Sequence, residues 1–213
     1  MASTLWLVLA AAPVLAGPLD DRLELATGVL QDLLSESPPP ASLLRETTCI
    51  AVLPRVIQAA IGVGGRHGKG VMACRREGGD WSPPAFLQMS GGSLGFQLGA
   101  ESSDVVLLIV DERSARSLLR SKFTIGTDAK AAAGPRSAGT AATTDARLDA
   151  EIYSYATAKG FFAGVSLGGA KLKLNRNDVS SYYRERPLPE DLLFGRAQVT
   201  VPAAAAAFRS ALP

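Results

Sequence analysis

The feature that most limits the fold is a glycine-rich stretch over residues 61–99, IGVGGRHGKGVMACRREGGDWSPPAFLQMSGGSLGFQLG. Glycine at this density disfavours a long helix, because each glycine in a helix interior costs about 1 kcal/mol relative to alanine. Short apolar runs stand between the glycines, a pattern typical of strands joined by tight turns. The stretch therefore predicts strands separated by two turns, RHGK at 66–69 and EGGD at 77–80.

The dipeptide Gly68-Lys69 raises the question of nucleotide binding, because a P-loop also places lysine after glycine. A P-loop needs glycine at position 63 and Ser or Thr at position 70, but the chain has Val63 and Gly70 there. A dinucleotide-binding fingerprint also fails, since its third glycine falls on His67. We therefore expect the glycines to shape turns and closely packed strands.

Hydrophobic spacing along the rest of the chain predicts both helices and strands. Apolar residues at helical spacing over 20–36 predict a helix that docks on the core, with a membrane surface as the alternative. DVVLLIV at 104–110 is expected as a central strand, and Asp111 is expected to cap the following helix. Residues 126–147 form either a functional loop or a small-residue strand. The other expected elements are strands at 49–53, 85–90, 93–100 and 123–126, a helical turn at 55–60, a three-stranded meander over 151–175, and helices at 177–185, 189–195 and after Pro202.

The N-terminus has the character of an export signal. LWLVLAAAPVLAG is apolar and ends in small residues, so we expect a signal peptide over 1–16 that is cleaved after Ala16. An uncleaved anchor is the alternative, although a membrane span takes about 20 apolar residues. The remaining chain divides into an N-terminal helix with a Pro-rich turn (17–40), one domain (41–195) and a C-terminal tail or helix (196–213).

The two cysteines, Cys49 and Cys74, lie in strand-like runs that we expect to pair. In an exported protein an even number of cysteines predicts a disulfide, here worth about 3 kcal/mol through loop closure. Two buried free thiols are the alternative. Two cysteines and one histidine do not supply a tetrahedral zinc site, so neither a metal nor a cofactor is expected.

Charge is balanced overall but segregated along the chain. The net charge is +2, which argues against a nucleic-acid partner. Acidic residues are absent from 47–76 and from 152–177, although basic residues occur in both. On a strand, Lys171 and Lys173 point to the same side, so a basic surface for anionic lipid is expected, with an ordinary solvated strand face as the alternative. The candidate lipid-binding residues are Arg66, Lys69, Arg75, Arg76, Lys159, Lys171, Lys173 and Arg176.

Catalytic chemistry has little support in the sequence. His67 is the only histidine, and no G-x-S-x-G elbow presents a serine nucleophile. Asp149 and Glu151 would share one side of a strand, but they are equally typical of solvated surface carboxylates. We therefore predict no catalytic residues.

Taken together, these motifs resemble the SYLF-domain family. The resemblance spans roughly residues 42–195 and rests on order and spacing: AVLP at 51–54, VGGRHGKGV at 63–71, WSPPAF at 81–86, GGSLGFQLG at 91–99, DVVLLI at 104–109, SKFTIGTDA at 121–129, AAGP at 132–135 and EIYSYATAKGFFAGVSLGG at 151–169. It implies an α+β fold, with a single strongly bent, mostly antiparallel sheet flanked by helices.

The resemblance also implies a function. SYLF domains bind lipid, with phosphoinositides as eukaryotic ligands, and some eukaryotic members bind actin; no enzymatic activity is implied. We expect an exported, bacterial-type member that is periplasmic or secreted and peripherally attached to anionic phospholipid of the cell envelope. Actin is not an expected partner there. The alternatives are an envelope assembly protein that binds another protein and, less favoured, an uncharacterised hydrolase.

Overall fold

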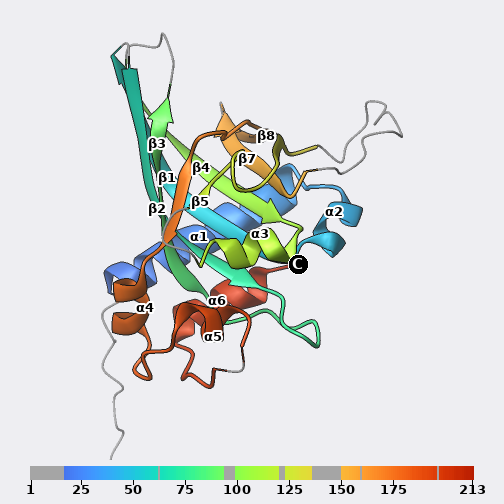
Figure 1. The fold of residues 1–213 in the computed structure, drawn as a ribbon, viewed down its shortest axis with the longest axis vertical. Helices are drawn as coiled ribbons and strands as arrows, with labels where there is room; N and C mark the ends of the chain where they lie inside the picture. The colour runs from blue at the N-terminus through green and yellow to red at the C-terminus, as the bar shows by residue number, and fades with distance from the viewer. Residues whose placement is uncertain are drawn as a thin grey trace, which may run out of the picture.

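The computed structural model describes residues 17–61, 63–93, 99–119, 123–135, 150–158, 160–195 and 197–213 (Figure 1). Within these residues the helices are α1 (Pro18–Glu36), α2 (Ala41–Glu46), α3 (Glu112–Ser117), α4 (Arg176–Tyr182), α5 (Pro189–Leu193) and α6 (Ala203–Ala211). The strands are β1 (Cys49–Ile61), β2 (Val63–Cys74), β3 (Ala85–Ser93), β4 (Gly99–Ile109), β5 (Phe123–Thr124), β6 (Ala131–Ala133), β7 (Ile152–Ala158), β8 (Phe161–Gly164) and β9 (Lys171–Leu174).

These strands form one strongly curled sheet in the order β5-β9-β3-β2-β1-β4-β7-β6, with β8 paired to β7. The described pairs are antiparallel except β6–β7, which is parallel. The predicted single α+β domain is confirmed. The expected central strand is also confirmed, since β4 lies between β1 and β7.

Two local predictions in the glycine-rich region are wrong. Residues 55–60 do not form a helical turn, because β1 continues through a bulge between Leu53 and Val56. Arg55 adopts a positive φ of 52° at this bulge, and its N–H donates a hydrogen bond to Asp104 Oδ1 at 2.9 Å. Residues 66–69 are not a turn either, since they lie inside β2 and pair with β3.

Close strand packing explains these glycines better than turn geometry does. A Cβ on Gly70 would lie 2.1 Å from the carbonyl oxygen of Val52, so only glycine fits at this point of β2. The predicted EGGD turn is confirmed: Gly78 and Gly79 have positive φ values, and Arg75 bridges to Trp81 across the turn.

The expected meander over 151–175 is only partly correct. β7 and β8 form a hairpin, but β9 lies near the opposite edge of the sheet, where it pairs with β3 and β5. Within the segment 126–147, residues 131–133 form the small-residue strand β6, while residues 136–147 lie outside the described residues. The predicted short helices near the C-terminus are confirmed as α4, α5 and α6, and the Asp111 side chain accepts from Ser114 N–H as the predicted cap.

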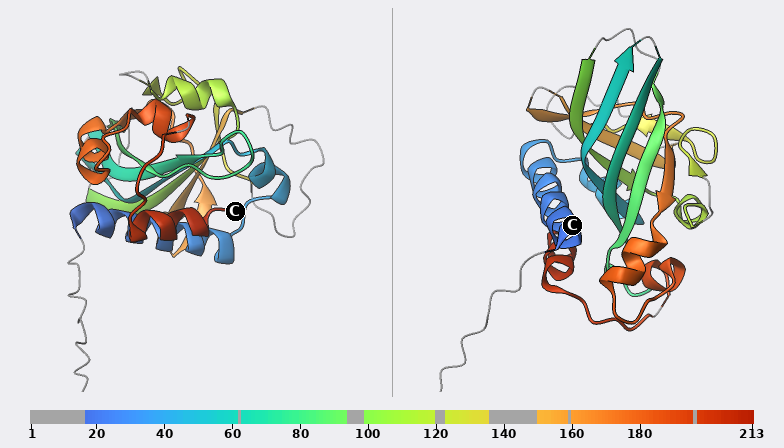
Figure 2. Two further views of the ribbon diagram at one scale, coloured as in Figure 1. Left: turned by 90° about the horizontal axis from the view of Figure 1, so that it is seen from below. Right: turned by 90° about the vertical axis from the view of Figure 1, so that its left-hand side faces the viewer.

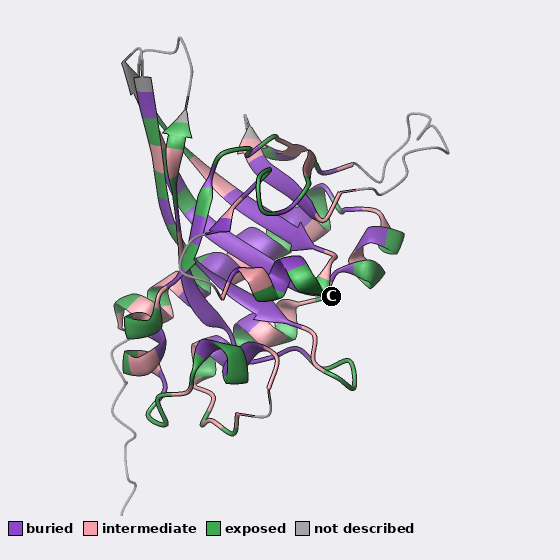
Figure 3. Ribbon diagram, in the orientation of Figure 1, coloured by how far each residue is buried: buried purple, intermediate pink, exposed green. Residues whose placement is uncertain are grey.

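Helices cover only part of the sheet. α1 and α6 run side by side over one face (Figure 2), where α1 buries its predicted apolar stripe, including Leu23, Leu30 and Leu33. The docking of this helix on the core is confirmed. Buried residues concentrate beneath the helices, whereas the strands that extend past them carry exposed residues (Figure 3). None of the helices within the described ranges has both the length and the apolar character needed to cross a bilayer.

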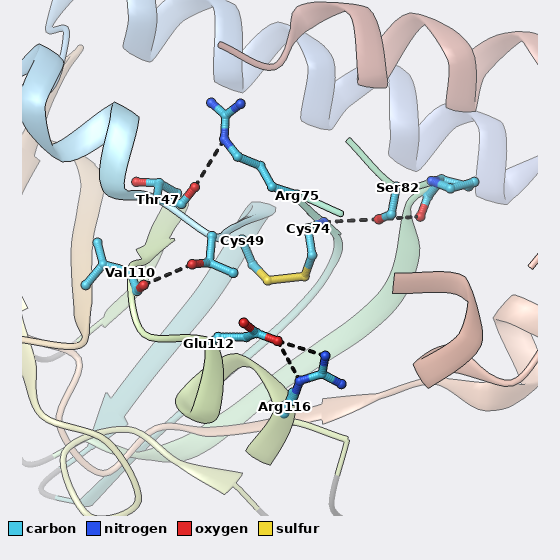
Figure 4. The surroundings of a disulfide bond; sticks show 10 residues. Thr47, Cys49, Cys74, Arg75, Ser82, Val110, Glu112 and Arg116 are labelled. Carbon is cyan, nitrogen blue, oxygen red and sulfur yellow. Dashed lines mark hydrogen bonds and ion pairs between the residues drawn. A yellow bond between two sulfur atoms is a disulfide. The ribbon is translucent and has the colours of Figure 1, made fainter. Parts of the chain in front are cut away.

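The predicted disulfide joins β1 to β2 at the covered end of the sheet. Cys49 lies directly opposite Cys74, and both residues are fully buried (Figure 4). Cys74 N–H donates to Ser82 Oγ at 3.1 Å, which fixes the start of the segment that leads to β3. The disulfide therefore fastens the two strands beneath α1 and leaves their other ends projecting.

Candidate functional site

Three lysines gather on the open part of the sheet because of strand register. Lys69 of β2 lies opposite Gln88 of β3, and Gln88 lies opposite Lys173 of β9. One row further, His67 lies opposite Ser90, and Ser90 lies opposite Lys171. Directly opposed residues share a face, and two strand spacings place Lys69 and Lys173 about 10 Å apart. We call Lys69, Lys171 and Lys173, together with His67, Gln88 and Ser90, the basic face.

The lysine side chains of the basic face are exposed, and no described residue neutralises them. The side chains of Lys69, Lys171 and Lys173 make no hydrogen bond or ion pair with any residue that the structure describes. Like charges at this spacing repel one another, so the arrangement favours an anionic ligand that lies across the strands. His67 is also exposed, and it lies in strand β2 rather than in the predicted turn.

The basic face continues into an apolar contact point. Ile57 of β1 lies opposite His67 and is 56% exposed. Ser102 of β4 is the next residue in this row, and Thr124 of β5 ends the row beyond Lys171. The surface thus combines cations, hydroxyls and one exposed aliphatic group.

Arg176 lies at the edge of this surface. It opens α4 immediately after β9 and lines a pocket of about 540 Å³ together with Lys173 and Gln88. The sequence pattern does not single out Gln88, because a lone glutamine in an apolar run carries no signal until strand register is known.

Arg75 and Arg76 lie elsewhere, at the disulfide end of β2. The Arg75 guanidinium lies over the Trp81 ring and donates hydrogen bonds to the carbonyl oxygens of Thr47 and Pro213 (Figure 4 shows the first). Arg76 Nη2 donates to the carbonyl oxygen of Leu192 at 2.6 Å. Both arginines therefore hold C-terminal segments against the sheet.

Arg66 points to the opposite face from Lys69, since Gln58 and Gly91 are its cross-strand neighbours. Its Nε and Nη1 are buried without a hydrogen-bond partner in the described chain, and burial lowers the pKa of its guanidinium. Lys159, the last of the eight candidates, lies outside the described residues. Sequence proximity therefore groups residues that the fold separates.

The aromatic residues of the acid-free segment 152–177 are mostly buried. Tyr153, Tyr155 and Phe162 lie in the core, and burial raises the pKa of Tyr155, whereas Phe161 is 53% exposed. Of the two carboxylates considered above, Glu151 accepts a hydrogen bond from the backbone N–H of Lys130 at 2.8 Å, while Asp149 lies outside the described residues. In the part of the chain that the structure describes, no three His, Cys, Asp or Glu side chains form a group suited to a metal ion.

Known proteins with similar sequences come from one family. Residues 90–213 match the family model described as Ysc84, Las17-binding protein actin regulator. Protein YSC84 of Saccharomyces cerevisiae is 32% identical over 163 residues, which cover 75% of this chain and 35% of the relative. SH3 domain-containing YSC84-like protein 1 of Xenopus laevis is 31% identical over 158 residues, covering 73% of this chain and 47% of the relative.

A third relative is SH3 domain-containing protein PJ696.02 of Schizosaccharomyces pombe, 33% identical over 178 residues that cover 82% of this chain and 41% of the relative. The chain thus spans between 35% and 47% of the length of these three relatives. All three are eukaryotic proteins, so the expectation of a bacterial-type member is not borne out.

Proposed function

This chain belongs to the Ysc84 family of Las17-binding protein actin regulators, the SYLF-domain family, and on that basis we propose that it is a non-enzymatic protein that binds anionic lipid surfaces. The proposed contact surface is the basic face on β2, β3 and β9. Arg176 extends this surface at the start of α4.

The observation that carries this proposal is the set of unneutralised lysines on an open sheet face. Each Lys or Arg held near an anionic membrane contributes about 1 kcal/mol of attraction. Lys69, Lys171 and Lys173 together would contribute about 3 kcal/mol, which suits reversible, peripheral attachment. Ile57, exposed in the same surface, adds an apolar group where headgroups meet acyl chains.

A protein partner is the second candidate function. The family description and the names of the relatives refer to Las17 binding, actin regulation and SH3 domains. The basic face would equally suit an acidic protein surface, and strand register would present its lysines as a fixed pattern. Binding that requires a protein and ignores vesicles would favour this candidate.

We also propose that the protein is exported and acts at a membrane surface of an oxidising compartment. Two observations support this: residues 1–16 have signal-peptide character, and Cys49 is bonded to Cys74. N-terminal sequencing of the protein from its native membrane fraction tests cleavage. The proposal expects Gly17 as the first residue, and an intact Met1 would indicate an anchor instead.

Charge reversal on the basic face tests the lipid-binding proposal. The variant Lys69→Glu with Lys171→Glu is titrated against vesicles that contain phosphatidylglycerol. We expect affinity to fall about tenfold or more, because two attractions become repulsions. Arg45→Glu with Arg113→Glu is the matched control, since it changes net charge equally on α2 and α3, away from the basic face. Equal losses in the two double variants would contradict a localised surface.

A further inference from the structure

The pocket between β9 and α4 is lined mainly by cationic and amide side chains. Lys173 and Arg176 supply two cations, and Gln88, Asn175 and Asn177 supply three side-chain amides. Leu119 and Leu174 are the other described residues of the lining. A volume of about 540 Å³ is large enough for a small organic ligand rather than a lone water molecule.

The side-chain hydrogen-bond donors of these five polar residues make no bond to any residue that the structure describes. Asn175 uses its Oδ1 to accept the backbone N–H of Asp178 at 3.1 Å, which caps α4 and leaves the Nδ2 group free to donate. Neither Gln88, Lys173, Arg176 nor Asn177 donates a side-chain hydrogen bond to any described part of the chain. Five unused donor groups around one hollow favour a ligand that is rich in acceptors.

The charge of the pocket selects an anion. Of the described residues, no carboxylate lines it. The acid that follows in sequence, Asp178, is already neutralised, because its Oδ2 forms an ion pair with Arg22 Nη1 at 2.7 Å. Lys173 and Arg176 therefore face the pocket without a competing carboxylate from any described residue.

We propose that this pocket binds a phosphate monoester. The proposal deepens the lipid association inferred above, on which it rests, by assigning the chemical class of the bound group. A monoester carries a charge of about −1.5 to −2 and three terminal oxygens, whereas a diester carries one charge and two such oxygens. Arginine binds phosphate with two parallel hydrogen bonds and lysine binds it as a point charge, so a cation pair with amide donors matches the monoester best.

The ligand chemistry has two sources, a lipid headgroup or a soluble phosphate ester, and two probes separate them. The full protein is titrated with glycerol 3-phosphate by calorimetry. It is also floated with vesicles of phosphatidic acid, a monoester, or of phosphatidylglycerol, a diester, at matched surface charge. Arg176→Gln with Asn177→Leu is the test variant. Arg45→Gln is the control, since it removes one charge from α2, outside the pocket.

Saturable binding of one glycerol 3-phosphate per chain, weakened about tenfold or more in the test variant alone, supports the pocket with a soluble ligand. A preference for phosphatidic acid over phosphatidylglycerol that the test variant loses supports the pocket with a lipid ligand. Equal binding of wild type, test variant and control to every probe overturns the pocket.

Failure of the pocket and failure of the proposed function have different signatures. The first case is vesicle binding that depends on Lys69 and Lys171, does not distinguish the two lipids and is unchanged in Arg176→Gln/Asn177→Leu. In that case the basic face is supported as the lipid-binding surface, and the pocket is rejected. If no vesicle binds, the proposed function is rejected, and the soluble probe alone then decides the pocket. Circular dichroism checks that Arg176→Gln/Asn177→Leu is folded, which is expected because both positions are exposed.

Discussion

The guanidinium of Arg75 lies 4.4 Å from the centre of the Trp81 ring, and both side chains donate a hydrogen bond to the carbonyl oxygen of Pro213. This arrangement joins the end of β2, the turn that follows it and the segment after α6. Arg209 of α6 closes the cluster by donating to the carbonyl oxygen of Trp81 at 3.1 Å. The guanidinium of Arg75 thus makes its contacts within the protein, and we do not expect it to bind lipid.

Replacing Arg75 with alanine tests this structural role. The change removes a cation–π contact of about 0.5–1 kcal/mol and two hydrogen bonds of about 1 kcal/mol each. We expect urea denaturation to show a loss of about 2–3 kcal/mol in the free energy of unfolding, with vesicle affinity unchanged. Arg45→Ala, exposed on α2, is expected to stay within about 0.5 kcal/mol of wild type. Weaker vesicle binding at unchanged stability would place Arg75 in the lipid site after all.

Removal of the disulfide has a predictable cost. Cys49→Ala with Cys74→Ala frees a loop with a sequence separation of 25 residues and is expected to lower the free energy of unfolding by about 3 kcal/mol. Denaturation of the wild type in reducing buffer supplies the comparison. If wild-type stability is the same with and without reductant, and free thiols are alkylated in native protein, the disulfide does not form.

Two glycines with opposite surroundings provide a matched pair of alanine substitutions. A Cβ at Gly134 would lie 2.1 Å from the ring of Tyr155, whose hydroxyl donates to the carbonyl oxygen of Pro135. We expect Gly134→Ala to destabilise the protein by about 1–3 kcal/mol through overpacking. Gly28 lies within α1 with nothing near its Cβ position, so Gly28→Ala is expected to stabilise by about 0.5–1 kcal/mol. Thermal melting of both variants checks the pair, and a tolerated Gly134→Ala would contradict the packing of β6 against β7.

Acid sensitivity has one contribution that can be assigned. Thr200 donates hydrogen bonds to Glu185 Oε1 through its backbone N–H and its hydroxyl, and these bonds lower the pKa of Glu185. Because the pKa is lower in the folded state, the stabilisation is present above the usual carboxyl range and is lost as pH falls through the folded-state value. We expect the melting temperature of wild type to fall more steeply below about pH 5 than that of Glu185→Gln. Parallel curves for the two proteins would reject this contribution.

The sequence predicts the individual helices, strands and turns of this fold better than it predicts which strands pair with one another. The apolar run of β4, the Asp111 cap and the EGGD turn are local signals, and the structure confirms them. Residues 66–69 resemble a turn because glycine is enriched in turns and depleted in strands. The pairing of these residues with β3 and the close approach of Val52 to Gly70 show that β2 continues through this region, and both depend on tertiary structure.

The candidate site shows the same division. Alternation along β9 places Lys171 and Lys173 on one side, as the sequence predicts. Lys69 lies on the same face near Lys171 and Lys173 only because β9 pairs with β3 instead of with β8. No local sequence pattern indicates this pairing. Arg66 and Arg75 lie in the same acid-free segment as Lys69. Strand alternation places Arg66 on the opposite face, however, and Arg75 follows the far end of β2, next to the disulfide.

Flotation of the purified protein with vesicles tests the central claim most directly, using neutral phosphatidylcholine against mixtures with phosphatidylglycerol at low and high salt. The account predicts binding to the anionic vesicles alone, weakening strongly as the Debye length shortens from about 10 Å at 0.1 M salt to about 3 Å at 1 M. Failure to float with either vesicle at low salt would contradict lipid binding by the basic face and favour a protein partner.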